Sequence, residues 1–184
     1  MSVDASHNIN DKEAARDWQS GKSQYPNLDV LIQPDAYMLA RLPPTARVTP
    51  TILELLSKPV DPKDTECFFC TVSRTQRELS FLVSASAKHS WENLEAELNP
   101  NGNKAKSDGF GVDGPWRAFR IRGPMGFREV GVLLEFSKCL AARSISIFAV
   151  STWDTDYICV KGGNFSNACQ ALKDDGWNLV GASD

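Results

Sequence analysis

The chain has 184 residues, of which 42% are hydrophobic and 23% charged, and its formal net charge is −3. This composition is typical of a globular protein that can bury one good core or two small ones. The chain has no Lys/Arg cluster that could neutralise phosphates, which argues against a nucleic-acid partner. Its longest apolar runs are far shorter than a bilayer span, which argues against a membrane partner.

The cysteines and the N-terminal residues favour a cytoplasmic protein. The first twenty residues are polar and lack the apolar stretch of a signal peptide. Five scattered cysteines do not form a secreted disulfide framework. Cys67 and Cys70 lie in an apolar run that predicts a strand, where residues three apart face opposite sides at roughly 10 Å. Since His7 and His89 are the only histidines, we predict neither a metal site, nor another cofactor, nor a His-based nucleophile.

The N-terminal half predicts a flexible tail followed by a first, less regular unit. Residues 1–25 are polar and show no sustained period, so we expect them to be flexible. The first unit is expected over residues 26–98, and residues 99–114, rich in Gly, Asn, Pro and Asp, predict a connector. The elements expected in the first unit are strands at Val30–Ile32 and Tyr37–Leu42, a short helix from Thr49-Pro50, hairpin strands at Glu66–Val72 and Glu78–Val83, and a helical turn at Ser90–Leu98.

The C-terminal half, residues 115–184, predicts a clearer order of elements. These are a strand at Trp116–Ile121, a helix at Phe127–Ala142, strands at Ser144–Ser151 and Asp156–Lys161, a helix from an Asn164 N-cap to Gly176, and an edge strand at Trp177–Val180.

This order is β-α-β-β-α-β, the ferredoxin-like arrangement. A weak internal repeat at an offset of 78 residues places Ser73 on Ser151 and Glu78 on Asp156, which favours a first unit of the same plan. The predicted fold class is therefore α+β, with two ferredoxin-like units packed together so that each covers what the other exposes.

Two segments of the second unit carry complementary polar groups. Gly131 stands at the mouth of a helix, where free backbone amides attract a carboxylate. Beyond the strand that ends at Ser151, Thr152 and Asp156 offer a hydroxyl and an anion to a cationic group, and Trp153 offers a flat surface to a guanidinium. Together these groups suit a free amino acid. Structural interpretations stay open: close helix packing for Gly131, a turn role for Asp156, and covering of the core edge for Trp153.

The run Trp116–Leu179 also carries a family resemblance. Its motifs Gly-Pro-Met-Gly-Phe-Arg-Glu-Val-Gly-Val and Ser-Thr-Trp-Asp-Thr-Asp, with the closing amphipathic helix, resemble the ACT regulatory domains of the CASTOR type. Such domains occur in the cytosolic arginine sensors and in small stand-alone proteins of two ACT units. The resemblance is dense in the second half and weak in the first. It implies two ACT units and a non-enzymatic module whose amino acid lies where two such units meet.

The resemblance also implies roles for individual residues. Gly131 and Val132 would hold the backbone groups of the amino acid, and Trp153 and Asp156 would hold its side chain, with Thr152 beside them. The full set of candidate ligand-binding residues is Glu129, Val130, Gly131, Val132, Ser151, Thr152, Trp153 and Asp156.

These observations favour a regulatory or sensor protein that binds arginine or another polar or cationic amino acid between ACT units. Pairing through the second unit predicts a homodimer with two equivalent sites. Two alternatives stay open. One is a small isomerase- or cyclase-type enzyme in which Asp156 and Glu129 carry out acid/base chemistry. The other is a protein-interaction module that an amino acid switches.

Overall fold

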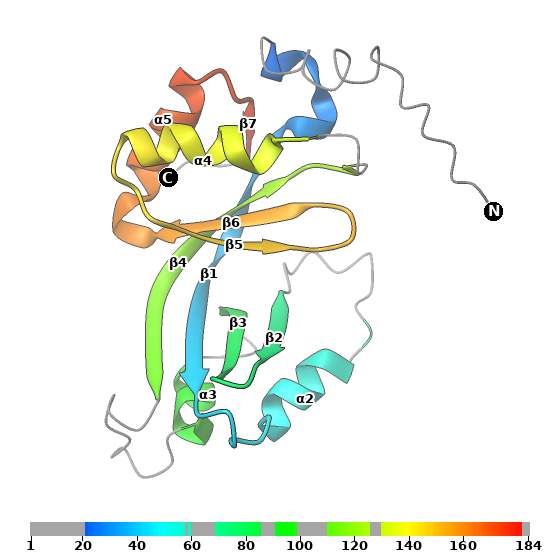
Figure 1. The fold of residues 1–184 in the computed structure, drawn as a ribbon, viewed down its shortest axis with the longest axis vertical. Coiled ribbons are helices and arrows are strands. Elements are labelled where there is room, and N and C mark those ends of the chain that lie inside the picture. Colours follow the sequence, from blue (N-terminus) through cyan, green and yellow to red (C-terminus); the bar gives the residue numbers. More distant parts are fainter. Residues whose placement is uncertain are drawn as a thin grey trace, which may run out of the picture. The chain divides into compact units, whose positions relative to one another are not determined.

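The computed structural model describes residues 21–57, 59, 69–85, 91–98, 110–125 and 130–181. It is a mixed α+β protein with a largely antiparallel sheet (Figure 1). The chain divides into two compact units: unit 1 comprises residues 1–32 and 119–184, and unit 2 comprises residues 33–118. Each unit therefore takes residues from both β1 (Val30–Leu42) and β4 (Gly111–Ile121). The predicted α+β class with ferredoxin-like units is confirmed, whereas the predicted domain ranges stay a prediction.

Unit 1 follows the predicted β-α-β-β-α-β order. After the end of β4 come α4 (Val132–Ala142), β5 (Ile147–Ser151), β6 (Asp156–Lys161), the short 3-10 turn η5 (Gly162–Asn164), α5 (Phe165–Asp174) and β7 (Leu179–Val180). In the sheet, β4 adjoins β6 and β6 adjoins β5. The β5–β6 hairpin is antiparallel and ends with the pair Ser151 and Asp156.

The start of β1 completes the sheet of unit 1. β1 adjoins β4, and the two-residue β7 pairs in parallel with Val30 and Leu31 instead of pairing with β4. Just before β1 come the 3-10 turns η2 (Lys22–Gln24) and η3 (Pro26–Leu28), of which η2 lies within residues 1–25, the range predicted to be a flexible tail. Residues 1–20 of that predicted tail lie outside the described residues.

Unit 2 repeats the same plan. From Gln33 in β1 it continues through α2 (Pro50–Ser57), β2 (Cys70–Arg74), β3 (Leu79–Ala85) and α3 (Trp91–Leu98) to the first part of β4. Its strand order is β2-β3-β1-β4, the arrangement of a ferredoxin-like sheet. Residues 111–114 of the predicted connector belong to β4, and residues 99–109 lie outside the described part.

The prediction of two separate strands at Val30–Ile32 and Tyr37–Leu42 is wrong, because one strand runs through both. Pro34 lies between the two predicted strands, and proline cannot donate a ladder hydrogen bond. The register shows why it is tolerated. Among the described residues, β7 pairs with Val30 and Leu31 of β1 and β3 pairs with β1 from Ala36 onward, so neither register includes Pro34.

The prediction that the helix of unit 1 starts near Phe127 is also wrong within the described residues, since α4 starts at Val132. Gly131 has φ 89°, a left-handed conformation that a right-handed helix cannot contain. Residues 126–129 lie outside the described part. For α5 the predicted cap position Asn164 is confirmed, but its side chain makes no capping hydrogen bond.

Aromatic side chains hold α4 and α5 on the sheet of unit 1. The ring of Phe119 on β4 lies 5.1 Å from that of Phe165 on α5 and 6.0 Å from that of Phe136 on α4, measured between centroids. Burial of each such ring contributes about 1.5–3 kcal/mol. Val132, the first residue of α4, is buried in the same cluster. The start of α4 is therefore fixed by the core of the unit.

A smaller apolar cluster forms the core of unit 2. There Ile52 and Leu55 of α2 are buried together with Leu79 and Phe81 of β3, while Leu53 and Leu56 on the same helix are exposed. Only two of these four apolar side chains of α2 are therefore buried. Among the described residues of the chain, no helix is long and apolar enough to cross a bilayer.

Candidate functional site

Unit 1 carries a hollow of about 350 Å³ between the start of α4 and the β5–β6 hairpin. Residues 131–134 form its helix side, residues 151–156 form its hairpin side, and Met125 lies on a third side. Its volume falls within the range of small-molecule sites, about 300–1,000 Å³. The helix mouth and the polar strand end that the sequence singled out thus meet at one place in the structure.

The helix side presents backbone donors. Gly131 is the N-cap of α4 and has no side-chain capping bond, and its carbonyl accepts the first helical hydrogen bond from Glu135 N at 3.0 Å. The N–H groups of Val132, Leu133 and Leu134 have no partner among the described residues. Because the helix dipole adds partial positive charge at this end, the helix side favours an anionic group such as a carboxylate.

The hairpin side presents mainly acceptors. The hydroxyl of Ser151 donates to Asp156 Oδ1 at 2.6 Å, and the hydroxyl of Thr152 donates to the carbonyl of Thr155 at 3.0 Å. The Thr152 N–H donates to the same carbonyl at 2.8 Å and closes the turn. Both hydroxyl protons are therefore engaged within the hairpin, which leaves the second carboxylate oxygen of Asp156 as an acceptor for a ligand.

The segment that follows β4 holds the tip of this hairpin in place. Met125 N donates to the carbonyl of Asp154 at 2.9 Å, and the buried Thr155 hydroxyl donates to the carbonyl of Ile121. Gly123 has φ 68°, and a Cβ added there would lie 2.8 Å from the Asp154 carbonyl oxygen. A glycine is therefore needed where the two segments approach each other.

The rim of the hollow is apolar and its hairpin end is negative. Trp153 is 84% exposed and Leu134 is 59% exposed. Asp154 and Asp156 form no ion pair with a described residue, and no Lys or Arg is among the described residues that line the hollow. The lining therefore joins a positive helix end to two carboxylates, an arrangement that suits a zwitterion.

Six of the eight predicted ligand-binding residues line this hollow, namely Gly131, Val132, Ser151, Thr152, Trp153 and Asp156. Val130 lies in the preceding turn, is 65% exposed and is not part of the lining. Glu129 lies outside the described residues. The ligand-binding role of all eight stays a prediction.

Five residues that line the hollow are absent from the list of candidate ligand-binding residues: Met125, Leu133, Leu134, Asp154 and Thr155. Two of them had a usable signal, because Leu133 and Leu134 must follow Val132 in the first turn of any helix capped by Gly131. Met125 had none, since its place depends on the hydrogen bond to the carbonyl of Asp154.

Metal and thiol chemistry find little support in the described part of the chain. No group of three His, Cys, Asp or Glu side chains is placed there to hold a metal ion. Cys67 is outside the described residues, so its predicted orientation opposite Cys70 stays a prediction. Burial raises the pKa of the Cys70 thiol to about 11 and that of the Cys159 thiol to about 12. Both thiols are protonated and weakly nucleophilic near neutral pH.

Comparison with known protein families finds a match over part of the chain. Residues 111–174, which include the start of α4 and the β5–β6 hairpin, match the ACT domain family.

Solved structures of similar fold extend over nearly the whole chain. The protein Atu0741 from Agobacterium tumefaciens is 22% identical with a TM-score of 0.59, covering 85% of this chain and 94% of that one. The protein VC0802 from Vibrio cholerae, of unknown function and named as a possible transport protein, is 14% identical with a TM-score of 0.53, covering 85% and 97%. A structure of the aspartokinase alpha and beta subunits is 14% identical with a TM-score of 0.54, covering 80% and 96%. These likenesses establish the fold, and the finer resemblance to the arginine sensors stays a prediction.

Proposed function

We propose that this chain is a regulatory protein that binds a free amino acid in the hollow between α4 and the β5–β6 hairpin. One observation carries the proposal: the uncapped start of α4 and the carboxylate of Asp156 line the same hollow of about 350 Å³. The ACT domain match over residues 111–174 supports it, because ACT domains are regulatory domains that bind amino acids.

The expected pose follows from the charges. The ligand's α-carboxylate accepts hydrogen bonds from the N–H groups of Val132 and Leu133 at the start of α4. A cationic group of the ligand donates to Asp156, whose orientation Ser151 fixes through its hydroxyl. Hydrogen bonds to charged groups contribute about 1.5–3 kcal/mol each, which is enough for specific binding of a small polar molecule.

The ligand class proposed is an amino acid with a cationic side chain, such as arginine or lysine. Asp154 and Asp156 place two negative charges at the hairpin end, and Trp153 offers an exposed ring for stacking of a guanidinium. A dicarboxylic amino acid would bring a third negative charge to the same end, so glutamate and aspartate are expected to bind far more weakly.

A homodimer in the cytoplasm forms part of the proposal. Trp153 and Leu134 leave apolar surface exposed beside the hollow, and a second copy of the chain would cover this surface and exclude water from the ligand. The amino acid would then lie at an interface between ACT units. Sedimentation should show a dimer, and a chain that stays monomeric at high concentration would remove this part.

Isothermal titration calorimetry tests the binding proposal. Wild-type protein is titrated with arginine, lysine, glutamine and glutamate, and arginine or lysine is expected to bind tightest. Asp156→Asn should weaken arginine binding about tenfold or more, since it removes the charge that faces the cation. Glu54→Gln is the matched control, because it removes one exposed carboxylate of unit 2. The remaining standard amino acids are titrated in the same way, and if none of the twenty gives heat, the proposal is wrong.

A further inference from the structure

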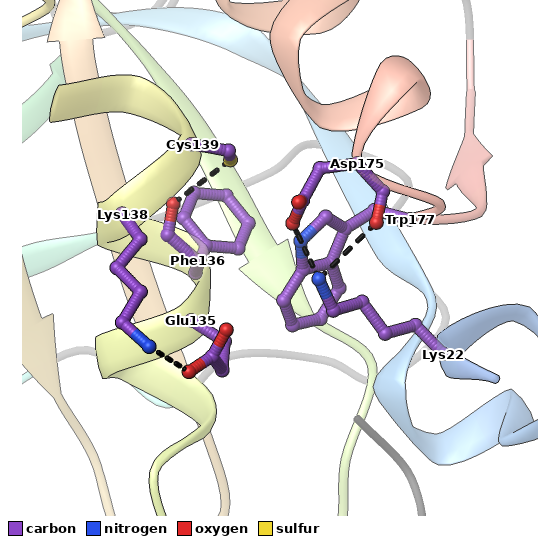
Figure 2. A network of polar contacts seen from close by, with 7 residues as sticks. All are labelled: Lys22, Glu135, Phe136, Lys138, Cys139, Asp175 and Trp177. Atoms are coloured by element: carbon purple, nitrogen blue, oxygen red, sulfur yellow. Dashed lines mark hydrogen bonds and ion pairs between the residues drawn. The ribbon is translucent and has the colours of Figure 1, made fainter. Parts of the chain in front are cut away.

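Residues 22–29, which we call the clasp, belong to unit 1 and pack on the rest of it through a buried lysine. The side chain of Lys22 is 7% exposed. Its Nζ donates to the Asp175 carbonyl at 3.1 Å, forms an ion pair with the Asp175 carboxylate, and lies 5.1 Å from the centre of the Trp177 ring (Figure 2). The Trp177 indole N–H donates to the same carboxylate at 3.1 Å. One cation thus ties the clasp to the end of α5.

The other end of the clasp is held by a second polar cluster. Asp29 is buried; its Oδ1 accepts a hydrogen bond from Asn178 at 2.7 Å, and its Oδ2 pairs with Arg122 at 3.1 Å. The backbone adds two bonds, from Arg122 N to the Asp29 carbonyl and from Gly123 N to the Asn27 carbonyl, each 2.8 Å long. The clasp is therefore the hydrogen-bonding partner of residues 122 and 123.

Residues 122 and 123 immediately precede the segment that lines the hollow. Gly123 lies against the Asp154 carbonyl, and Met125 N donates to that same carbonyl at 2.9 Å. Met125 and Asp154 both line the hollow. The clasp thus fixes the segment that positions the hairpin tip.

A second series of contacts connects the clasp, through the core of unit 1, with the helix side of the hollow. The ring of Trp177, on which Lys22 lies, is 5.3 Å from the ring of Phe136 on α4 (Figure 2). Phe136 packs one helical turn after Val132, which lines the hollow, and both are buried in one cluster. Both walls of the hollow therefore have a contact path to the clasp.

Building on the proposed function, we propose that docking of the clasp and binding of an amino acid in the hollow are coupled. The docked clasp holds the hairpin tip and the start of α4 in the arrangement that binds the ligand. Coupling between two sites is reciprocal, so the bound amino acid stabilises the docked clasp by the same factor. The clasp then reports occupancy of the hollow to whatever contacts the N-terminal side of unit 1.

The first test needs no ligand. In Lys22→Met, amide exchange measured by NMR should speed up about tenfold or more at Arg122 and Gly123, and also at Met125, because loss of the clasp lowers the local opening free energy. Lys138→Met is the matched control. Lys138 makes an exposed ion pair with Glu135 on α4 (Figure 2), and its loss should leave Met125 unchanged. Asp29→Asn is the second variant, should Lys22→Met fail to fold.

The second test measures arginine binding by calorimetry. Lys22→Met and Asp29→Asn should weaken it on the order of fivefold or more, the lower range of allosteric coupling, and Lys138→Met should not. Saturating arginine should slow exchange at Arg122 and Gly123 in the wild type. Faster exchange at residues 122 and 123 with Met125 unaffected, or equal arginine affinity in all variants, would overturn the coupling. If Met125 exchanges faster in Lys22→Met but calorimetry detects no amino acid binding to the wild type, the proposed function is refuted and the link between clasp and hairpin stands.

Discussion

The two units contain corresponding corners, each made of a hairpin and the start of a helix, and the corners differ in what they leave open. In unit 1 the β5–β6 hairpin turns over residues 152–155, and in unit 2 the β2–β3 hairpin turns over residues 75–78. Each turn is closed by a bond of 2.8 Å, from Thr152 N to the Thr155 carbonyl and from Thr75 N to the Glu78 carbonyl. The two turns thus share their length and their closing bond.

The corresponding residues show where the corners diverge. The last ladder pair before each turn is Ser151 with Asp156 in unit 1 and Arg74 with Leu79 in unit 2. The hairpins therefore correspond at an offset one residue smaller than the predicted 78. At this register unit 2 has a buried leucine where unit 1 has the carboxylate of Asp156. At the position of Asp156, unit 2 therefore lacks the carboxylate that we propose for a cationic ligand.

The starts of α2 and α4 also differ in whether protein groups accept hydrogen bonds from the first N–H groups of the helix. In α2, Pro50 has no N–H, Thr51 N donates to Glu97 Oε1 at 3.2 Å, and Ile52 N donates to Thr49 Oγ1 at 3.3 Å. At the start of α4 no side chain of the described residues makes a capping hydrogen bond. Glu97 of α3 therefore occupies in unit 2 the position that we propose for the ligand's carboxylate in unit 1. The comparison shows that one fold can close a helix start internally or leave it available.

The largest expected effect, on arginine binding, comes from replacing Asp156 of unit 1 by leucine, the residue that unit 2 has at the corresponding position 79. Asp156→Leu removes the carboxylate and leaves the Ser151 hydroxyl without its acceptor. Arginine binding should weaken by about 2–3 kcal/mol, since a hydrogen bond to a charged group is lost. Calorimetry measures this directly, and circular dichroism checks that the sheet is retained. Unchanged affinity would mean that the two corners do not differ in the way proposed.

The backbone at the start of α4 gives the next effect. Gly131 has φ 89°, so Gly131→Ala should lower the free energy of unfolding by roughly 1–2 kcal/mol. Gly163 is a matched control because a Cβ there meets open space and its φ is not positive. Thermal denaturation should show a lower Tm for Gly131→Ala and little change for Gly163→Ala. Equal effects of the two substitutions would contradict the left-handed turn at Gly131.

Removing the carboxylate of Glu97 in unit 2 should lower the free energy of unfolding by a smaller amount and leave arginine binding unchanged. Glu97→Ala deprives Thr51 N of its acceptor and should lower the free energy of unfolding by about 1 kcal/mol, the usual loss of a helix cap. Glu54→Ala, at an exposed site on α2, is the control. Arginine should still bind once per chain, because Pro50 and Leu79 remain. A second binding event in Glu97→Ala would show that Glu97 alone closes that corner.

The two corners also show which features of the fold and of the candidate site could be predicted from the sequence. Local signals sufficed for the element order of unit 1 and for the β2–β3 hairpin, because glycine, turn residues and apolar periods act over short distances. Long-range pairings left no local signal. The placement of β7 beside Leu31, and of Glu97 at Thr51, depends on segments far apart in the chain.

The smallest effect concerns thiols on the two hairpins. Burial raises the pKa of Cys70 on β2 to about 11 and that of the more deeply buried Cys159 on β6 to about 12, from 9.0. At pH 8 both are thiols, so iodoacetamide should label Cys159 more slowly than Cys70, as peptide mass mapping would show. Because the folded pKa values are raised, the stability that these thiols contribute is full below pH 9 and falls as the pH rises toward 11–12. In the strand order, β6 lies between β4 and β5, whereas β2 is at the end and pairs with β3, so β2 is expected to open more readily. Faster labelling of Cys159 than of Cys70 would contradict this expectation.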